Sequence, residues 1–317
     1  MATLICGVDV SSISLDARIG SQGTEASFEN NPEGVAGLAV FCQQHGVELV
    51  AMEATGGYEK LSFGLLWGSG IPVALLNPRS VRRFAQGMGF DEKTDRIDAG
   101  VIAWFAEVKN VVPTQPASAA QAQLEAMVTR LRQLTELHAA QRNQRLLVSE
   151  ASVLDSFCEL LALVKTQIRA LEKAIAELIA ADPLWQQLNM AFRSIKGVAG
   201  RTVSRLMAEM PEIGTASNKA VAKLAGLAPL AKDSGKTQGK RVVRGGRSNV
   251  RTILYVVADV VRRYNADFAA FADRLRAAGK PKKVVRIALA HKLLVRLNAK
   301  AREIRQQHPS AACFETC

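Results

Sequence analysis

The first 110 residues alternate between short apolar runs and longer amphipathic stretches. Apolar runs bounded by Gly, Pro, Asn or Ser predict strands, whereas apolar residues that recur every third or fourth position predict helices. In chain order we expect three strands, a helix, a strand, a helix, a strand and two helices, over residues 3–10, 15–19, 26–28, 35–45, 48–52, 58–67, 71–76 and 78–86 and from Asp95 onward.

This order of elements favours an α/β domain with a ribonuclease H-like fold. In that fold, three strands joined by hairpins come first, and alternating helices and strands follow them. Open sheets of this kind place their ligands at the carboxyl ends of the strands. We therefore predict a ribonuclease H-like domain over residues 1–112, which ends where the Pro-rich segment 112–116 begins.

The rest of the chain is predicted to be mainly helical. Apolar residues beyond the Pro-rich segment follow the spacing of a coiled-coil seam, which predicts two long helices folded back on each other or paired between subunits. Asp182-Pro183 ends the seam, because the residue before a proline disfavours helix. We expect a coiled-coil linker over 113–185 and a helical domain over 186–317. The seam residues are Leu124, Met127, Leu131, Leu134, Val164, Ile168, Leu171, Ile175 and Leu178.

Charge is distributed unevenly between these regions. Residues 1–110 carry 8 basic and 13 acidic side chains, whereas residues 196–317 carry 25 basic and 8 acidic ones. The whole chain of 317 residues has a net charge of +12 and a pI near 9.7. A strongly basic region favours a polyanionic partner such as nucleic acid.

Cysteine usage and the absence of long apolar runs bear on the compartment. The five cysteines are scattered and lack the spacing of a zinc site, so we expect free thiols in a reducing cytoplasm. No apolar run approaches the roughly 18 residues that span a bilayer, and the N-terminus does not resemble a signal peptide. We expect a cytoplasmic, nucleoid-associated bacterial protein with no membrane partner.

Four acidic residues lie on the elements that meet at one edge of the predicted sheet. Asp9 ends the first strand, Glu53 follows the fourth, and Asp95 and Asp98 are three residues apart at the start of a helix. Converging carboxylates repel one another unless a cation joins them, and Mg²⁺ prefers oxygen ligands. The sequence therefore predicts a site for Mg²⁺ that would polarise a phosphate.

Two other interpretations of these residues remain open. An acidic pair at a helix start is also a common complement to the helix dipole. The segment 7–12 resembles the phosphate loop of actin-like and sugar-kinase ATPases, and the segment 54–57 could form a second nucleotide turn. The chain has neither a recognisable adenosine loop nor a second ribonuclease H-like copy, and nucleotide binding would leave the basic C-terminal region unexplained.

The segment 195–202 has the form of a helix-hairpin-helix. Gly197 and Gly200 would let the backbone approach a phosphate, and Arg201 precedes the helix expected over residues 203–210. The first N–H groups of a helix bind phosphate independently of base sequence. A plain glycine turn between two helices is the alternative.

Further along, a glycine-rich basic run surrounds a serine. Ser234 precedes Gly235 and is a candidate nucleophile, although a serine before glycine is most often a turn residue. The run could wrap a phosphate backbone, and two lysines open the last helix. The basic residues expected to bind nucleic acid are Lys236, Lys240, Arg241, Arg244, Arg247, Arg251, Lys282 and Lys283.

Taken in order, these motifs resemble the transposases of the insertion-sequence-110 family, including its 1111 subgroup and the related pilin-gene invertase. The resemblance covers nearly the whole chain, with small departures: Lys196 stands where the family often has proline, and Asp233 where glutamate can precede the serine. The motifs are Gly7-Val8-Asp9, Glu53-Ala54-Thr55-Gly56-Gly57-Tyr58, Asn77-Pro78, Lys93-Thr94-Asp95-Arg96-Ile97-Asp98-Ala99, residues 195–202, Ala225-Gly226-Leu227-Ala228-Pro229 and Asp233-Ser234-Gly235.

The resemblance implies a RuvC-like domain in which Asp9, Glu53, Asp95 and Asp98 bind Mg²⁺. It also implies that Ser234 attacks DNA and forms a covalent phosphoserine link. The family further implies a structured non-coding guide RNA, often called a bridge RNA, that pairs with donor and target DNA. Homodimers that assemble into homotetramers are expected as well.

Three functions remain as alternatives at this point. The first is an RNA-guided recombinase that excises and inserts a mobile element. The second is a Holliday-junction resolvase or DNA-inverting nuclease that uses only the metal site, with Ser234 as a turn residue. The third is a basic protein that organises DNA or RNA without catalysis.

Overall fold

The computed structural model describes residues 3–90, 95–231, 233–234, 239 and 241–307, and describes no side chains for residues 95–98. Two compact units make up the chain, Met1–Ala117 and Ser118–Cys317. In the part of the chain that is described, no helix has both the length and the hydropathy needed to cross a membrane. The cysteines described, Cys6, Cys42 and Cys158, are free.

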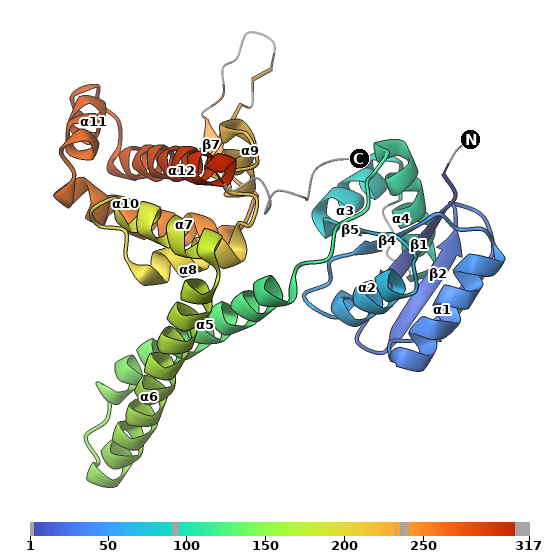
Figure 1. The fold of residues 1–317 in the computed structure, drawn as a ribbon, viewed down its shortest axis with the longest axis horizontal. Coiled ribbons are helices and arrows are strands. Elements are labelled where there is room, and N and C mark those ends of the chain that lie inside the picture. Colours follow the sequence, from blue (N-terminus) through green and yellow to red (C-terminus); the bar gives the residue numbers. More distant parts are fainter. Residues whose placement is uncertain (1–2, 91–94, 232, 235–238, 240, 308–317) are drawn as a thin grey trace. The chain divides into compact units, whose positions relative to one another are not determined.

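The first unit is a five-stranded mixed sheet with helices on both faces (Figure 1). The strand order is β3-β2-β1-β4-β5, in which β2 is antiparallel to its neighbours and β4 and β5 are parallel to β1. This is the strand order of a ribonuclease H-like domain, so the predicted fold is confirmed. The elements are β1 (Ile5–Val10), β2 (Ser14–Ile19), β3 (Glu25–Glu29), α1 (Pro32–Gln44), β4 (Leu49–Glu53), α2 (Glu59–Gly68), β5 (Val73–Leu76), α3 (Pro78–Gly87) and α4 (Asp95–Lys109).

The central strands β1 and β4 are buried on both faces of the sheet. Successive side chains of a strand point to opposite faces, so each strand contributes to two clusters. On one side, Cys6 and Val8 of β1 belong to a cluster with α1 and α2. On the other side, Ile5 belongs to a cluster with α3 and α4. Local chemistry sets where the helices begin: Asn31 caps α1 by accepting a hydrogen bond from the Gly34 amide at 2.7 Å.

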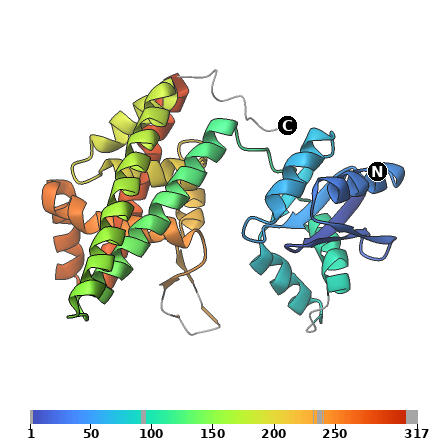
Figure 2. The ribbon, with the colours of Figure 1, turned by 90° about the horizontal axis from the view of Figure 1, so that it is seen from below.

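The second unit is helical around one continuous apolar core. Its two longest N-terminal helices, α5 and α6, lie side by side in both ribbon views (Figures 1 and 2). The remaining helices pack on one another, and α12 contacts α7, α9, α10 and α11. The elements are α5 (Ala119–Arg145), α6 (Ala151–Ala181), α7 (Pro183–Arg193), α8 (Gly200–Glu209), α9 (Asn218–Leu224), β6 (Pro229–Leu230), β7 (Val242–Val243), α10 (Ser248–Tyr264), α11 (Ala266–Ala277) and α12 (Lys282–Gln307).

Candidate functional sites

Two of the predicted acids lie next to each other at the end of the sheet. The parallel pairing of β1 with β4 runs as far as Val8 opposite Met52. Asp9 and Glu53 are the next residues, so they lie at the carboxyl ends of neighbouring strands. Asp9 is two residues beyond Gly7 and therefore points to the same face of the sheet as the Gly7 position does.

Helix α4 lies directly on that face. A Cβ atom built on Gly7 would be 2.0 Å from the carbonyl oxygen of Ala99 and 2.6 Å from the backbone nitrogen of Ala103. No side chain fits into this space. Glycine at position 7 therefore lets the backbone of α4 approach β1 two residues before Asp9.

A second contact fixes the direction of α4. The amide of Gly20 donates a hydrogen bond to the carbonyl of Ile5 at the start of β1. A Cβ atom built on Gly20 would be 3.7 Å from Oε1 of Glu107, near the C-terminal end of α4. Because Gly7 contacts the N-terminal half of α4, the helix runs antiparallel to β1. Its first turn, residues 95–98, thus lies at the end of β1 that carries Asp9.

These positions fit a magnesium site at the level of the backbone. Carboxylate oxygens are the ligands that Mg²⁺ prefers, and the elements carrying Asp9, Glu53, Asp95 and Asp98 end or begin at the same edge. The side chains of Asp95 and Asp98 lie outside those described, and among the remaining described side chains no group of three or more His, Cys, Asp or Glu residues could hold a metal. That the four carboxylates coordinate the same ion stays a prediction.

Two further acids near this edge were not singled out from the sequence. Asp16 of β2 lies opposite Asp9 in the antiparallel register, and its carboxylate accepts a hydrogen bond from the Ser27 hydroxyl at 2.7 Å. Glu59 is buried and accepts from the amides of Thr55 at 3.1 Å and Gly57 at 2.8 Å. Only the register and the local fold bring these partners together.

Glu59 also bears on the nucleotide-binding alternative. A phosphate loop uses free backbone N–H groups to hold its anion. Here the carboxylate of Glu59 already occupies the N–H groups of Thr55 and Gly57. These N–H groups of the loop after Glu53 are therefore not available to bind a phosphate, which argues against the ATPase interpretation.

In the second unit, Ser234 is exposed and belongs to the hairpin formed by the antiparallel strands β6 and β7. The residue before it, Asp233, binds Nη1 of Arg241 on the opposite arm through both carboxylate oxygens, at 2.6 and 2.7 Å. Oδ1 of Asp233 also accepts a hydrogen bond from the Gly239 amide at 3.0 Å. Lys236 and Lys240 lie outside the described residues.

The root of the hairpin is held by close backbone contacts. A Cβ atom on Gly246 would be 2.3 Å from the nitrogen of Gly226, so the loops before β6 and after β7 touch through their main chains. The Arg247 amide donates to the Leu224 carbonyl at 2.7 Å. The guanidinium of Arg251 donates to a carbonyl in the same loop at 2.6 Å.

An ion pair completes this root. Nη1 and Nη2 of Arg247 bind the two carboxylate oxygens of Glu212 at 2.6 and 2.5 Å. Burial raises the pKa of Glu212, but the hydrogen bond and charge of Arg247 outweigh it, so the pKa lies below its ordinary value. Three arginines of this region expected to bind nucleic acid, Arg241, Arg247 and Arg251, therefore have bonding partners within the protein. Arg244 is exposed.

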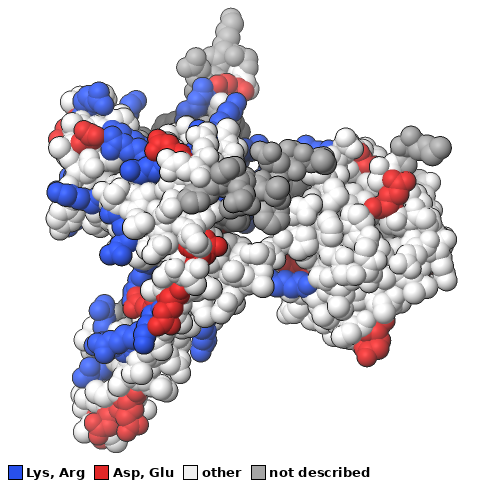
Figure 3. All heavy atoms as spheres, viewed as in Figure 1, with Lys and Arg blue, Asp and Glu red and all other residues white. Residues whose placement is uncertain are grey.

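The other residues expected to bind nucleic acid lie in the same unit. Gly197 lies between α7 and α8, and Gly200 and Arg201 are the first two residues of α8. Lys282 and Lys283 are exposed in the first turn of α12. Lysine and arginine side chains gather over the helices of this unit on the face that Figure 3 shows.

A ribonuclease H-like domain with acids at its sheet end, followed by a basic helical unit with an exposed serine hairpin, defines a DNA-processing enzyme of the transposase class. Residues 6–149 match the sequence profile of the IS110 family with a DEDD motif, described as a transposase. Residues 189–273 match a second profile, described as transposase of the IS116/IS110/IS902 family. The chain belongs to the IS110 family of transposases.

Curated relatives agree with this assignment. The chain is 28% identical over 310 residues to the pilin gene-inverting proteins of Moraxella lacunata and Moraxella bovis, covering 93% of this chain and 94% of each relative. It is 32% identical over 154 residues to the 43.6 kDa protein of insertion element IS110 of Streptomyces coelicolor, covering 48% of this chain and 37% of the relative.

Solved structures of Thermus thermophilus RuvC are also similar to part of the chain. The complex of that protein with a Holliday junction substrate has a TM-score of 0.27 and 16% identity, covering 35% of this chain and 99% of RuvC. A second RuvC structure from this organism has a TM-score of 0.26 and 17% identity, with the same coverage. The fold assignment above rests on the strand order itself.

Proposed function

We propose that this transposase is an RNA-guided DNA recombinase in which Ser234 forms a covalent phosphoserine link to DNA. The observation that carries the proposal is the exposed hairpin itself. It presents Ser234 to solvent beside the Asp233–Arg241 ion pair, and its root is anchored to the helical core. A serine on an anchored, solvent-facing hairpin in a basic unit suits attack on a polyanion.

In the proposed reaction, Oγ of Ser234 attacks the phosphorus of a DNA phosphodiester. A serine–phosphate bond forms, the bond from phosphorus to one DNA oxygen breaks, the serine proton is lost to solvent, and the leaving oxygen takes up a proton. The basic side chains near the hairpin, Arg241 and Arg244, would offset the charge that develops on the phosphate. The reverse reaction with a different DNA end would complete strand exchange.

Asp9, Glu53, Asp95 and Asp98 would hold Mg²⁺ at the end of the sheet. When bound there, the ion would supply charge neutralisation for a scissile phosphate. Asp9 and Glu53 are supported by their places at the ends of paired strands. Asp95 and Asp98 are supported by the direction of α4.

The proposal includes a guide RNA and an oligomer. The net charge of residues 196–317 favours a large polyanionic partner beyond a single DNA strand. The tip of the α5–α6 hairpin exposes apolar side chains, with Leu146 80%, Leu147 88% and Val153 43% exposed, which favours pairing with a second copy. In this arrangement, residues 113–185 act as a coiled-coil linker that joins a domain at 1–112 to a domain at 186–317. Helices α7 and α8 of the second domain form a helix-hairpin-helix.

A resolvase that uses only the metal site is the second candidate. It is favoured by the neighbouring positions of Asp9 and Glu53, because a metal-dependent nuclease built at that end of the sheet would not require Ser234. The two candidates differ in whether protein becomes joined to DNA.

The test is detection of a covalent protein–DNA adduct on a denaturing gel. The full-length protein is co-expressed with the RNA transcribed from the flank of its element and is incubated with Mg²⁺ and a labelled junction substrate. We expect an adduct that is abolished in Ser234→Ala and retained in Ser156→Ala, an exposed serine on α6 that serves as the matched control.

The outcomes separate the candidates. DNA cleavage without an adduct in the wild-type protein would overturn the serine mechanism and favour the resolvase. Normal cleavage by Asp98→Ala would overturn the magnesium site. An adduct formed equally well without the flanking RNA would overturn the guided mechanism while leaving the serine in place.

A further inference from the structure

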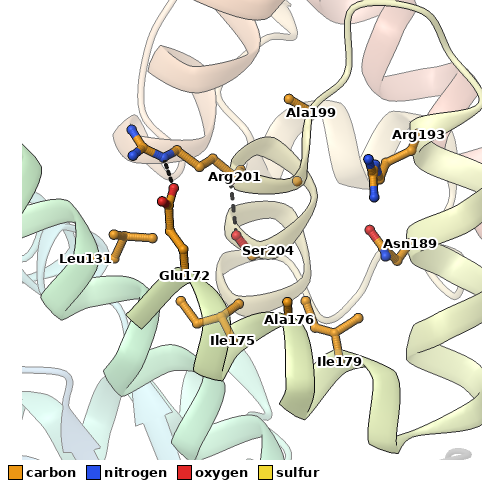
Figure 4. Close-up of a pocket in the computed structure, with 11 residues that line it drawn as sticks. Leu131, Glu172, Ile175, Ala176, Ile179, Asn189, Arg193, Ala199, Arg201 and Ser204 are labelled. Carbon is orange, nitrogen blue, oxygen red and sulfur yellow. Dashed lines mark hydrogen bonds and ion pairs between the residues drawn. The ribbon is translucent and has the colours of Figure 1, made fainter. Parts of the chain in front are cut away.

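A cavity of about 410 Å³ lies where α5, α6, α7 and α8 meet. Its floor is apolar, formed by Leu131, Ile175 and Ile179. Figure 4 shows Asn189 and Arg193 on one side of the cavity and Arg201 with Glu172 on the other. The volume lies within the range of small-ligand pockets, and the cavity combines an apolar floor with two guanidinium groups.

The two glycines of the segment 195–202 have different surroundings, and only Gly200 lines the cavity. Gly197 has a φ of +100°, and a Cβ atom there would be 3.0 Å from the backbone of Val261, so the fold itself requires glycine. Gly200 has no such requirement, because its φ is not positive and a Cβ atom there would meet nothing within 4 Å. A side chain at position 200 would point into open space beside the cavity that Gly200 lines.

The first turn of α8 adds hydrogen-bond donors to this opening. Ala199 is the N-cap residue of α8 and provides no side-chain hydrogen bond. The helix therefore begins without the side-chain oxygen that usually satisfies one of its first N–H groups. An anion bound in the opening of the cavity would lie beside this helix start.

A carboxylate of the protein already binds one of the two arginines. Nε of Arg201 donates to Oε1 of Glu172, which is the one acidic residue among the described residues that line the cavity. Both side chains are partly exposed, at 51% and 35%. A phosphate oxygen makes the same hydrogen bond with a guanidinium as a carboxylate oxygen does, so Glu172 holds Arg201 as a phosphate would.

We propose that this cavity binds an unpaired nucleotide of a nucleic-acid strand. Two phosphates of the strand are bound, one by Arg193 on one side of the cavity and one by Arg201 on the other, where it displaces Glu172. The base between them packs on the apolar floor with Asn189 at its edge. A duplex keeps its bases stacked inside and could not fill the floor, so the ligand is a single-stranded segment. This inference rests on the proposed function, because it assumes a nucleic-acid partner.

Affinity measurements on the full-length protein test the proposal. The probes are a fluorescently labelled twelve-nucleotide single-stranded RNA, the DNA strand of the same sequence, and the corresponding duplex. Fluorescence anisotropy at several salt concentrations gives the affinity and its salt dependence. Comparison of the affinities for the RNA strand and for the DNA strand shows which of the two nucleic acids the cavity prefers.

The matched pair for charge is Glu172→Gln and Glu177→Gln. Both residues lie on α6 and both form ion pairs, but Glu177 pairs with the exposed Lys173 and does not line the cavity. We expect Glu172→Gln to tighten single-strand binding by about twofold to fivefold, the range that corresponds to loss of an exposed ion pair. Glu177→Gln should change the affinity little.

The matched pair for access is Gly200→Ala and Gly64→Ala. Both glycines are helical, and a Cβ atom on either would meet nothing within 4 Å, so both variants should unfold at the wild-type temperature or above it. We expect only Gly200→Ala to weaken single-strand binding. Arg193→Ala should also weaken it and lower the slope of log affinity against log salt by about one.

Three results would overturn the proposal: equal effects of Glu172→Gln and Glu177→Gln, unchanged affinity in Arg193→Ala, or equal losses for single strand and duplex in Gly200→Ala. None of these results would affect the covalent adduct of Ser234. Failure of this inference is therefore distinguishable from failure of the proposed function.

Discussion

The end of the sheet in the first unit and the serine hairpin in the second unit position their candidate residues in different ways. Asp9 and Glu53 extend from strands paired over several residues and covered directly by the backbone of α4. Ser234 lies on a hairpin in which β6 and β7 are only two residues long. The hairpin is held at its root by Gly226, Gly246 and Arg247.

This difference has a physical consequence. At the sheet end, the candidate site and the core of the domain share the same backbone contacts, so a change that disturbs one also disturbs the other. At the hairpin, the anchoring contacts lie away from the serine. Stability and chemistry should therefore be separable in the second unit and inseparable in the first.

The largest effect is expected for Gly7→Val. The new side chain would overlap the backbone of α4 at Ala99, so we expect a loss of about 3 kcal/mol or more in the free energy of unfolding. Chemical denaturation measures this loss, with Gly64→Ala as the control that should be neutral or slightly stabilising. Unfolding of Gly7→Val at the wild-type denaturant concentration would contradict the close approach of α4.

A smaller effect is expected for Glu212→Gln, which breaks the ion pair at the hairpin root. Because both side chains are about a third exposed, solvent screening limits the loss to about 1 kcal/mol. The pKa of Glu212 is lowered in the folded state, so its contribution is present above the unfolded pKa and is lost as the pH falls through the folded pKa.

Thermal unfolding between pH 7 and pH 3 tests this linkage. The difference between the wild-type protein and Glu212→Gln should be largest near neutral pH and should shrink in acid. A difference that does not depend on pH would show that the ion pair is not the source of the stabilisation.

The smallest effect on stability is expected for Asp233→Asn. Asp233 and Arg241 are exposed, so the free energy of unfolding should fall by less than about 1 kcal/mol. Under the proposed function, formation of the covalent adduct should nevertheless slow severalfold, because Asp233 no longer holds the Arg241 guanidinium in position near Ser234. An adduct rate equal to the wild-type rate would assign Asp233 a role in the hairpin alone.

Much of the fold could be predicted from the sequence because its signals are local. The alternation of apolar runs predicted the order of strands and helices in the first unit, and the predicted positions agree with the observed ones to within a few residues. The spacing of apolar residues likewise predicted long helices at α5 and α6. The buried seam differs in detail, since Val128 and Ile179 are buried whereas Met127 and Leu178 are only partly buried.

What could not be predicted depends on contacts between residues far apart in the chain. The basic run around Ser234 suggested a flexible segment with every arginine available for phosphate. In the structure, Arg247 pairs with Glu212, 35 positions earlier, and Arg251 closes the hairpin root. Strands β6 and β7 are also too short to show an alternating pattern.

The candidate sites show the same limit. The positions of Asp9 and Glu53 at the end of the sheet could be predicted because each residue follows an apolar run that predicts a strand. Glu59 could not, because its role in closing the loop after Glu53 appears only when the turn is built. The cavity formed by α5, α6, α7 and α8 combines residues from four helices, and no local pattern marks it.

The closed root of the hairpin has a consequence for exchanging parts between relatives. Gly226 and Gly246 hold the two ends of the hairpin together. The contacts between these ends and the helical core therefore stay the same whatever segment joins β6 to β7. Doubling the length of such a loop costs only about 0.6 kcal/mol in closure entropy. The segment between β6 and β7 could thus be replaced by the corresponding segment of a related transposase without changes to the helices that support it.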